Sequence, residues 1–330
     1  MKKKTGILLA LVAALGWHSA ATSGELKLYG LMDMGLNLEN DGSGGGTVTR
    51  LNSGGQSSSR IGIKGSEALG GGLVASFVLE NGILADTGGI DQGGVLFGRQ
   101  SWVALGGDFG MLKLGRKYTV SAEVLDSFDP FHINMAGDAS RLLNVSGKRV
   151  NNNLSYTTPE LGGLSAQLSW GFGEQPGSLA AGRQLGASAS YARGPLALAL
   201  AYVDQDSAST RASASTIMLG GVYDAGALKL HAGAARNTDS LGLDTRDLLL
   251  GVSVPFGAAL LLADYIRKWD SGKAGGNAGQ FALGYSYALS RRTNVYTSYS
   301  QTHNGHAARY NTARNGDTDR LFNAGIRHFF

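Results

Sequence analysis

The stretch LSAQLSWGF, residues 164–172, places an apolar side chain at every second position and a small or polar side chain between them. LVASFVLE at 73–80, LGASASY at 185–191 and QFALGYSY at 280–287 follow the same pattern. A period of two predicts β-strands, because successive side chains of a strand point to opposite faces. From Glu25 onward this is the dominant period, so we expect an all-β chain.

The second face of these strands indicates their environment. Soluble β-sandwiches also alternate, but their water-facing side is usually rich in Lys and Glu. Here that face is mostly Gly, Ser, Ala, Gln and Asn, and only 16% of all residues are charged. An apolar exterior around a modestly polar interior is typical of a transmembrane barrel, with a soluble β-protein as the alternative.

The connections between the strands alternate in length. Short turns are expected at 67–70, 159–162, 193–195, 224–226, 255–257 and 290–292. Long polar stretches lie between them, at 40–59, 82–95, 205–213, 271–279 and 303–319. Short turns on one side and long loops on the other are usual in outer-membrane barrels. We therefore predict a transmembrane antiparallel β-barrel of about 16 strands, although the facing of the strand at 294–302 stays ambiguous.

The beginning of the chain is expected to be a cleavable signal peptide. Lys2 to Lys4 precede an apolar stretch from Gly6 to Gly16, and small residues follow. The stretch is too short for a membrane anchor, because a spanning helix needs about 20 apolar residues. We expect a signal peptide at 1–21, with cleavage after Ala21 or Ser23, and a single transmembrane β-barrel domain at 22–330.

A second uncharged stretch, residues 248–263, also needs to be tested as a membrane helix. It is short for a span, and Pro255 and Gly257 lie in its middle. Two strands joined by a tight turn at 255–257 explain it better. We therefore expect no transmembrane helix in the mature chain.

The composition argues against several classes of protein. Glycine numbers 51 without a collagen period, and proline only 5, which argues against both collagen and proline-rich disorder. Without the three leading lysines, 26 basic residues stand against 25 acidic ones, so no nucleic-acid footprint is expected. The absence of cysteine excludes thiolate sites. The histidines lack helical metal spacing and no G-x-S-x-G elbow occurs, so we expect no catalytic residues, cofactor or metal.

Several short segments resemble those of a known family. They are LYGLMD at 28–33, SRIGIKGSE at 59–67, FGRQ at 97–100, LGR at 114–116, RVNN at 149–152 and GIRHFF at 325–330. Together they resemble the general porins of Gram-negative bacteria, most closely the β-proteobacterial trimeric porins. The resemblance implies a homotrimer and a third external loop folded into the barrel, here the stretch 119–149. It also implies that a C-terminal phenylalanine, here Phe330, is read by the barrel assembly machinery.

The resemblance further implies that arginines line the barrel wall at the constriction, at Arg60, Arg99 and Arg116, with Lys64 as a further candidate. Alternation puts Arg60 opposite Ile61 and Ile63, as expected for a lumen residue, and puts Arg99 opposite Trp102. Arg116 shares a face with Leu114, so it needs a bulge at Gly115 to turn inward.

Acids are expected on the opposite wall of the passage. The stretch 119–149 offers Glu123, Asp126 and Asp129, and also Asp138. Which of them face the lumen is not determined by the sequence. We take the first three as hypotheses for the pore constriction.

The function expected from these features is an outer-membrane channel for passive diffusion of ions and small hydrophilic solutes. Its partners would be outer-membrane lipid, the barrel assembly machinery and two further copies of the chain. We expect small residues such as Ala197, Ala199 and Ala201 to point outward, where they would let barrels approach closely. A substrate-specific channel, a membrane-barrel surface protein or a membrane-barrel enzyme are the alternatives, and nothing in the sequence argues for catalysis.

Overall fold

The structure is a computed structural model that describes residues 24–210 and 212–330; the expected signal peptide lies outside the described residues. The first half of the chain contains β1 (Glu25–Asn40), β2 (Val48–Ser53), β3 (Arg60–Gly70), β4 (Leu73–Leu84), β5 (Gly89–Ile90), α1 (Asp91–Gly94), β6 (Gln100–Gly107), β7 (Gly110–Tyr118), α2 (Val120–Phe128), a 3-10 turn (Ala139–Arg141), β8 (Arg149–Thr157) and β9 (Leu164–Gly171). The second half contains β10 (Gln184–Arg193), β11 (Leu196–Asp206), β12 (Ser213–Asp224), β13 (Lys229–Asp239), β14 (Asp244–Phe256), β15 (Ala259–Asp270), β16 (Ala278–Ala288), β17 (Thr293–Asn304) and β18 (Thr318–Phe329).

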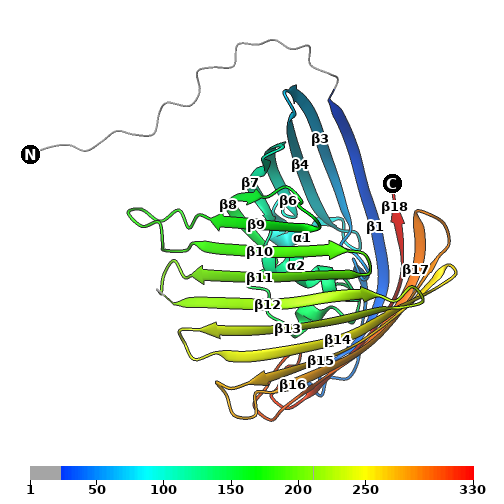
Figure 1. The fold of residues 1–330 in the computed structure, drawn as a ribbon. Coiled ribbons are helices and arrows are strands. Elements are labelled where there is room, and N and C mark those ends of the chain that lie inside the picture. Colours follow the sequence, from blue (N-terminus) through cyan, green and yellow to red (C-terminus); the bar gives the residue numbers. More distant parts are fainter. Residues whose placement is uncertain (1–23, 211) are drawn as a thin grey trace, which may run out of the picture.

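These strands form one antiparallel sheet that closes on itself (Figure 1). Closure comes from β1 and β18, which pair from Leu31↔Phe329 to Asn40↔Arg320. Both β2 and β3 pair with β1, so they are two parts of one wall strand interrupted at 54–59. The two-residue β5 pairs only with the end of β4. The wall therefore has 16 strands, as predicted, and closure leaves no free edge.

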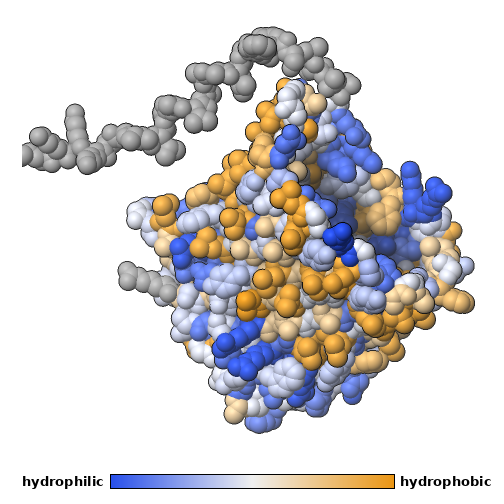
Figure 2. All heavy atoms as spheres, in the orientation of Figure 1, coloured by the Kyte–Doolittle hydropathy of each residue, from blue (hydrophilic) through white to orange (hydrophobic). Residues whose placement is uncertain are grey.

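Alternate side chains face lipid and lumen, as the sequence pattern predicts. On β11, Leu198, Leu200 and Tyr202 are exposed, whereas Ala199 and Ala201 between them are buried. The space-filling view shows apolar residues spread over the outer face of the strands (Figure 2). The ambiguous strand β17 is also resolved: its even-numbered residues, among them Ser298 and Thr302, are buried on the inside.

The short connections lie at or next to the predicted turns, but the long stretch expected at 40–59 contains the strand β2. β14 ends at Phe256 and β15 begins at Ala259, so residues 248–263 form two strands. No helix among residues 24–210 and 212–330 is both long and apolar enough to cross a membrane.

Loop 3, defined here as residues 119–148 between β7 and β8, enters the barrel, which confirms the predicted inward third loop (Figure 1). Its helix α2 packs against β10, β11, β12 and β13 on the inner wall. The fully buried Phe128 lies directly on two glycines, because a Cβ added to Gly220 or Gly233 would collide with its ring. Small residues on these strands thus make room for the loop.

This arrangement corrects one expectation. Ala199 and Ala201 do not face outward towards a second barrel. Both are buried inside the same apolar cluster as Val120, Val124 and Leu125 of α2. The reason is the strand period, because Leu198 and Leu200 occupy the lipid-facing positions of β11.

The last residue also contacts the first strand. Phe330 N donates to Gly30 O at 3.1 Å, and Gly30 N donates to Phe330 O at 3.2 Å. The ring packs on Gly30, where an added Cβ would collide with it. Phe330 therefore extends the β1–β18 seam by one residue pair.

Candidate pore constriction

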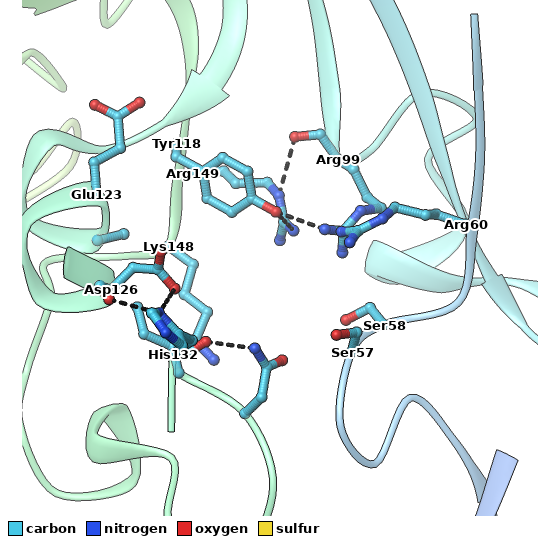
Figure 3. A pocket seen from close by; sticks show the side chains of 13 residues that line it. Ser57, Ser58, Arg60, Arg99, Tyr118, Glu123, Asp126, His132, Lys148 and Arg149 are labelled. Carbon is cyan, nitrogen blue, oxygen red and sulfur yellow. Dashed lines mark hydrogen bonds and ion pairs between the residues drawn. The ribbon is translucent and has the colours of Figure 1, made fainter. Parts of the chain in front are cut away.

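A cavity of about 310 Å³ lies inside the barrel between loop 3 and the wall. It is lined by the interruption at 54–59, by Arg60 at the start of β3, by Arg99 just before β6, by the strands β7 and β8 on either side of loop 3, and by loop 3 itself. The lining residues are Ser57, Ser58, Arg60, Arg99, Tyr118, Ala122, Glu123, Asp126, His132, Ile133, Asn134, Lys148 and Arg149. Figure 3 shows arginines on one side and the acids of α2 on the other.

Three arginines meet at the wall around Tyr118. Arg99 Nη2 donates to the Tyr118 hydroxyl at 2.6 Å, and Arg149 Nη2 donates to the same oxygen at 3.0 Å. The Arg149 guanidinium also lies over the Tyr118 ring, 4.6 Å from its centroid. Arg60 reaches the cavity from the first residue of β3. A shared phenolic acceptor fixes the geometry of cations that would otherwise repel each other.

Glu80 of β4 lies outside the cavity lining and compensates part of the positive charge of these arginines. Its Oε1 accepts from Arg99 Nε at 2.8 Å, and its Oε2 lies 4.0 Å from Arg60 Nε. The Arg99 and Glu80 side chains are only 4% and 5% exposed, so this pair is removed from bulk water. Arg149 has no carboxylate within 4 Å among the residues described. Its charge, and most of that of Arg60, is therefore directed at the passage.

The acids face the arginines from α2. Glu123 accepts from Lys117 Nζ at 3.2 Å, which offsets part of its charge. Asp126 lies 3.9 Å from His132 Nδ1. Burial raises the pKa of Asp126, and His132 acts in the opposite direction. The cavity lining thus carries four cations, with Lys148 as the fourth, against two carboxylates.

Not all the residues expected at the constriction lie there. Arg60, Arg99, Glu123 and Asp126 line the cavity. Lys64 lies beyond it, with its Nζ 5.4 Å from the centroid of the Tyr29 ring.

Asp129 does not face the passage. It is fully buried, and its carboxylate accepts from the backbone N–H groups of Phe131, Ile133 and Ala139 at 2.9, 2.8 and 3.1 Å. Its position at the end of α2 turns the side chain back into loop 3, so it holds the loop together instead of lining the pore.

The pairing of β7 with β8 is irregular next to Gly115, but this irregularity does not turn Arg116 inward as expected. The β7–β8 register shifts between Gly115 and Lys117, and Gly115 has a φ of +132°. Lys117 Nζ donates to Gln167 Oε1 at 2.6 Å and contacts Glu123, which places it under loop 3. Arg116 donates to Gly98 O at 2.7 Å and lies outside the cavity lining. Arg116 pairs with Ser101 on the same face as the exposed Leu114, where strict alternation places it, so the inward facing expected of Arg116 was wrong.

The alternation of side chains along β6 does not explain why Arg99 points into the lumen. Trp102 pairs with Val78, and its ring lies under Lys113 Nζ at 4.2 Å, on the same face as the buried Ala104. The outward positions of β6 are Val103 and Leu105. Arg99 precedes β6, where the period of two does not yet apply.

The interruption at 54–59 narrows the passage from the wall side. Asp33 Oδ2 accepts from the backbone N–H groups of Gln56 and Ser57 at 2.9 and 2.5 Å, and Tyr296 donates to Asp33 Oδ1 at 2.6 Å. From the other side, Met135 N of loop 3 donates to Gly55 O at 2.9 Å. The buried Asp33 therefore fixes a turn that the sequence indicated only as part of a long polar stretch.

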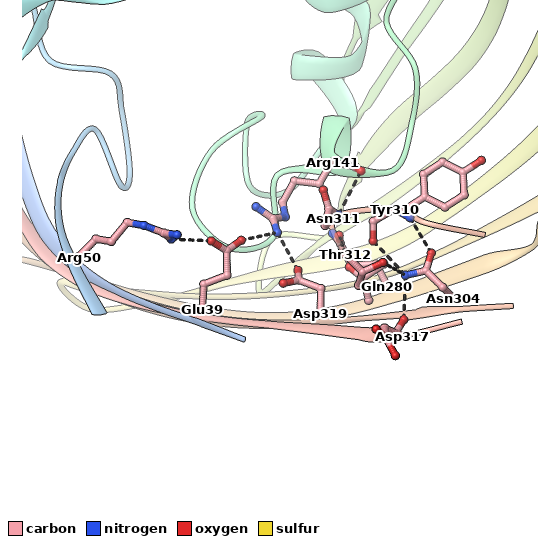
Figure 4. Close-up of polar contacts among 11 residues, drawn as sticks. Glu39, Arg50, Arg141, Gln280, Asn304, Tyr310, Asn311, Thr312, Asp317 and Asp319 are labelled. Atoms are coloured by element: carbon pink, nitrogen blue, oxygen red, sulfur yellow. Dashed lines mark hydrogen bonds and ion pairs between the residues drawn. The ribbon is translucent and has the colours of Figure 1, made fainter. Parts of the chain in front are cut away.

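A second polar cluster holds the far part of loop 3 (Figure 4). Arg141 Nη2 lies 2.7 Å from Asp319 and 3.5 Å from Glu39, and Arg50 contacts Glu39 at 2.8 Å. Asn311 of the last loop donates to Arg141 O at 3.3 Å. Loop 3 is thus fixed by α2 at one end and by Arg141 at the other.

The cavity lining also includes four residues that were not predicted from the sequence: Arg149, Tyr118, Lys148 and His132. A signal existed for Arg149, because it begins the RVNN segment that supported the family resemblance. No group of three or more His, Cys, Asp or Glu side chains that could hold a metal ion occurs in the described part of the chain.

The model of the family described as Gram-negative porin matches residues 8–307. The chain belongs to this family. Outer membrane porin protein 32 of Delftia acidovorans is 32% identical over 99% of this chain and 100% of its own length. An outer membrane porin protein of Bordetella pertussis is 28% identical over 89% of this chain and 92% of its own length.

Solved structures agree with the family assignment. The chain is similar to the anion-selective porin from Comamonas acidovorans, with a TM-score of 0.84 and 29% identity over 93% of this chain and 100% of that one. The trimer form of OmpT from Vibrio cholerae has a TM-score of 0.70 over 94% of this chain and 100% of that one, but at 16% identity it shows the fold alone. The protein is a porin, a channel of the bacterial outer membrane. Its family and fold are those of channels and not of enzymes.

Proposed function

We propose that this porin passes ions and small hydrophilic solutes by passive diffusion, and that its constriction favours anions. The observation that carries the proposal is the cluster of Arg60, Arg99 and Arg149 at the narrow cavity beside loop 3. Charges lining a narrow aqueous passage bias the entry of ions by their field.

The balance of charges supports the preference for anions. Glu80 compensates mainly Arg99, and Lys117 partly compensates Glu123. Arg60 and Arg149 are left facing the passage, with Asp126 and His132 on the opposite side. The similar porin from Comamonas acidovorans is described as anion-selective, which agrees with this assignment.

The test is the reversal potential of the channel in a KCl gradient across a planar bilayer. Replacing Arg60 and Arg149 together by glutamine removes two positive charges and leaves the buried Arg99–Glu80 pair intact. We expect the reversal potential to move towards that of a cation-selective channel. The matched control is Arg291→Gln with Arg292→Gln, which removes two charges from the exposed turn between β16 and β17. Equal reversal potentials in the wild type and the Arg60/Arg149 variant would contradict the proposal.

We further propose that the chain is exported with its leading residues removed, is inserted by the barrel assembly machinery through the strand ending at Phe330, and functions as a homotrimer in outer-membrane lipid. The trimer form of OmpT, with the same fold, supports the assembly state. The intact mass of the mature protein tests cleavage after Ala21 or Ser23. Cross-linking in outer-membrane vesicles tests the trimer, and only monomers would contradict it.

A further inference from the structure

A second polar hollow, of about 260 Å³, lies where β1, β3, β4 and β6 run side by side. Its lining residues are Glu25, Lys27, Lys64, Gly65, Ser66, Ser76, Phe77, Val78 and Trp102. Lys64, expected at the constriction, lies here instead. The hollow is separate from the cavity beside loop 3, because the two linings have no residue in common.

The lysines of this hollow point into the barrel. Lys27 of β1 lies on the same face as the buried Leu31 and opposite the exposed, lipid-facing Leu28. Lys64 of β3 pairs directly with Lys27, and residues that pair across a sheet share one face. Both ammonium groups are therefore on the inner, aqueous side of the wall.

The hollow lies between the constriction and the periplasmic exit. Lys64 follows Arg60 by four residues along β3, which corresponds to about 13 Å of strand. β3 then ends at Gly70 and β4 begins at Leu73, so the connection between them is short. Short connections lie on the periplasmic side in this class of barrel. An anion that has passed the arginines from outside therefore meets the hollow before it leaves the channel.

Two pairs of donors are placed directly opposite each other across the strands. Lys27 pairs with Lys64, and Ser66 pairs with Ser76 in the next inward row. Like charges placed directly opposite each other in a sheet are destabilising. An anion that accepts from both ammonium groups removes this repulsion, and the two hydroxyls can donate to the same anion.

Aromatic rings hold two lysines at the hollow without neutralising them. Lys64 Nζ lies 5.4 Å from the centroid of the Tyr29 ring, and Lys113 Nζ of β7 lies 4.2 Å from that of Trp102. The Trp102 ring is itself fixed, since its Nε1 donates to Gln100 Oε1 at 3.0 Å. An aromatic ring attracts a cation through its quadrupole but carries no net charge, so the positive charge stays available to an anion.

Carboxylates of the chain do not compensate these lysines. The luminal Lys268 has Asp247 at 2.7 Å. By contrast, no carboxylate among residues 24–210 and 212–330 lies within 4.0 Å of the Nζ atoms of Lys27, Lys64 or Lys113. The hollow and its rim thus carry three cations, and the only carboxylate in the lining is that of Glu25.

We propose that this hollow binds the phosphate group of a small solute, as the free ion or as a monoester, on the periplasmic side of the constriction. Lys27 and Lys64 contact the phosphate oxygens, and Ser66 and Ser76 donate to them. A phosphate dianion offers about two charges and three strong acceptor oxygens to these four donors, whereas a monocarboxylate offers one charge. The inference rests on the proposed passage of anions through the constriction.

The hollow also has room for an organic group beside the phosphate. Lys64 pairs with Val78, and Val78 pairs with Trp102. The row that begins with the two lysines therefore continues as an apolar surface, which the carbon atoms of a phosphate monoester can contact.

The experiment measures the block of chloride current through the full-length folded porin in a planar bilayer. Inorganic phosphate, glycerol phosphate or acetate is added to a fixed KCl concentration at about pH 8, where a phosphate monoester is a dianion. We expect both phosphates to lower the single-channel conductance, because a bound dianion repels chloride in the adjoining passage, and acetate not to lower it. In Lys27→Gln with Lys64→Gln, the half-blocking concentration should rise about tenfold, since two charge-assisted contacts are lost.

The matched control is Arg291→Gln with Arg292→Gln, which removes two charges from an exposed short turn on the same side of the barrel. Phosphate should block this control as it blocks the wild type. The migration of the unheated Lys27/Lys64 variant in a detergent gel shows that it is folded. A lower half-blocking concentration for glycerol phosphate than for inorganic phosphate would assign the hollow to phosphate monoesters, and equal values would assign it to the free ion.

Equal half-blocking concentrations in the wild type and the Lys27/Lys64 variant would overturn the proposal, and so would equal block by phosphate and acetate. An equal rise in the Arg291/Arg292 control would also overturn it, because the charge of the rim would then attract the phosphate. The reversal potential of the same channels keeps the two proposals apart. A wild-type channel with the sign of potassium permeation would contradict the ion preference of the constriction, whereas the block by phosphate tests the hollow.

Discussion

The arginines at the constriction differ in how much their removal is expected to destabilise the protein. Arg149 stacks on Tyr118 and faces water, whereas Arg99 is buried with Glu80. Removing one member of a buried ion pair leaves an uncompensated charge, which is more costly than removing an exposed charge. Arg149 therefore contributes to the electric field in the passage, whereas Arg99 contributes to the stability of the barrel wall.

Glu80→Gln tests the buried pair. It leaves Arg99 without its carboxylate and replaces one of the two oxygens that accept from Arg99 Nε and from the Tyr29 hydroxyl, which lies 2.9 Å from Glu80 Oε2. We expect a loss of about 3 to 5 kcal/mol in the free energy of unfolding. The measurement is the temperature at which the folded barrel changes its migration in a detergent gel. Glu67→Gln, at an exposed position near the end of β3, is the control, and equal temperatures for the two variants would refute the role of the pair.

Asp129 gives a pH dependence with a defined sign. Burial raises its pKa from an ordinary value of 3.8 to about 7, although three backbone N–H groups donate to it. A carboxyl that holds its proton more tightly in the folded state stabilises that state at low pH and loses this contribution as the pH rises. We expect the thermal midpoint of the barrel to fall between about pH 4 and pH 7, and Asp129→Asn to flatten this fall. A wild-type midpoint that does not change over this range would contradict the assignment.

At the scale of elements, loop 3 is held by two different kinds of contact. Phe128 packs on the glycines of β12 and β13, and Arg141 forms ion pairs with Glu39 and Asp319. Both attachments join parts of the chain far apart in sequence. They position α2, and with it Glu123 and Asp126, opposite the arginines.

Arg141→Gln tests the polar attachment. It leaves Asp319 buried without its cation, so we expect the far part of loop 3 to move. The expected result is an increase in current noise and in brief closures of single channels. Arg50→Gln removes the other cation that contacts Glu39 and is the matched control, because Arg50 does not contact loop 3. Identical current traces for the two variants would exclude Arg141 as an anchor of the loop.

The elements also show what the sequence can and cannot predict. Alternation and turn residues predicted the number of strands and the short turns, whereas the inward third loop was predicted from the family resemblance alone. The outward facing expected of Ala199 and Ala201 was wrong, although their alternation with Leu198 and Leu200 places them on the inner face. Alternation placed Arg116 on the face of Leu114, as the structure does, so the inward turn invoked to fit the family resemblance was wrong. A cavity lined by 54–59, β7 and loop 3 depends on contacts between distant segments, which no local pattern encodes.

For the whole molecule, the distribution of charge matters more than its sum. The full chain has a formal net charge of +4, yet Arg60 and Arg149 concentrate positive charge at the constriction inside the barrel. The closed sheet separates this surface from the outer face, since every wall strand is paired on both sides. Changes at Arg60 and Arg149 should therefore affect ion flow.

One planar-bilayer recording of the unmodified porin tests the central claim most directly. With KCl at different concentrations on the two sides, we predict discrete current steps, a conductance that rises nearly in proportion to the KCl concentration, and a reversal potential with the sign of chloride permeation. A conductance that saturates would indicate a solute-binding channel. Absence of steps, or a reversal potential with the sign of potassium permeation, would contradict the account of an arginine-lined, water-filled pore.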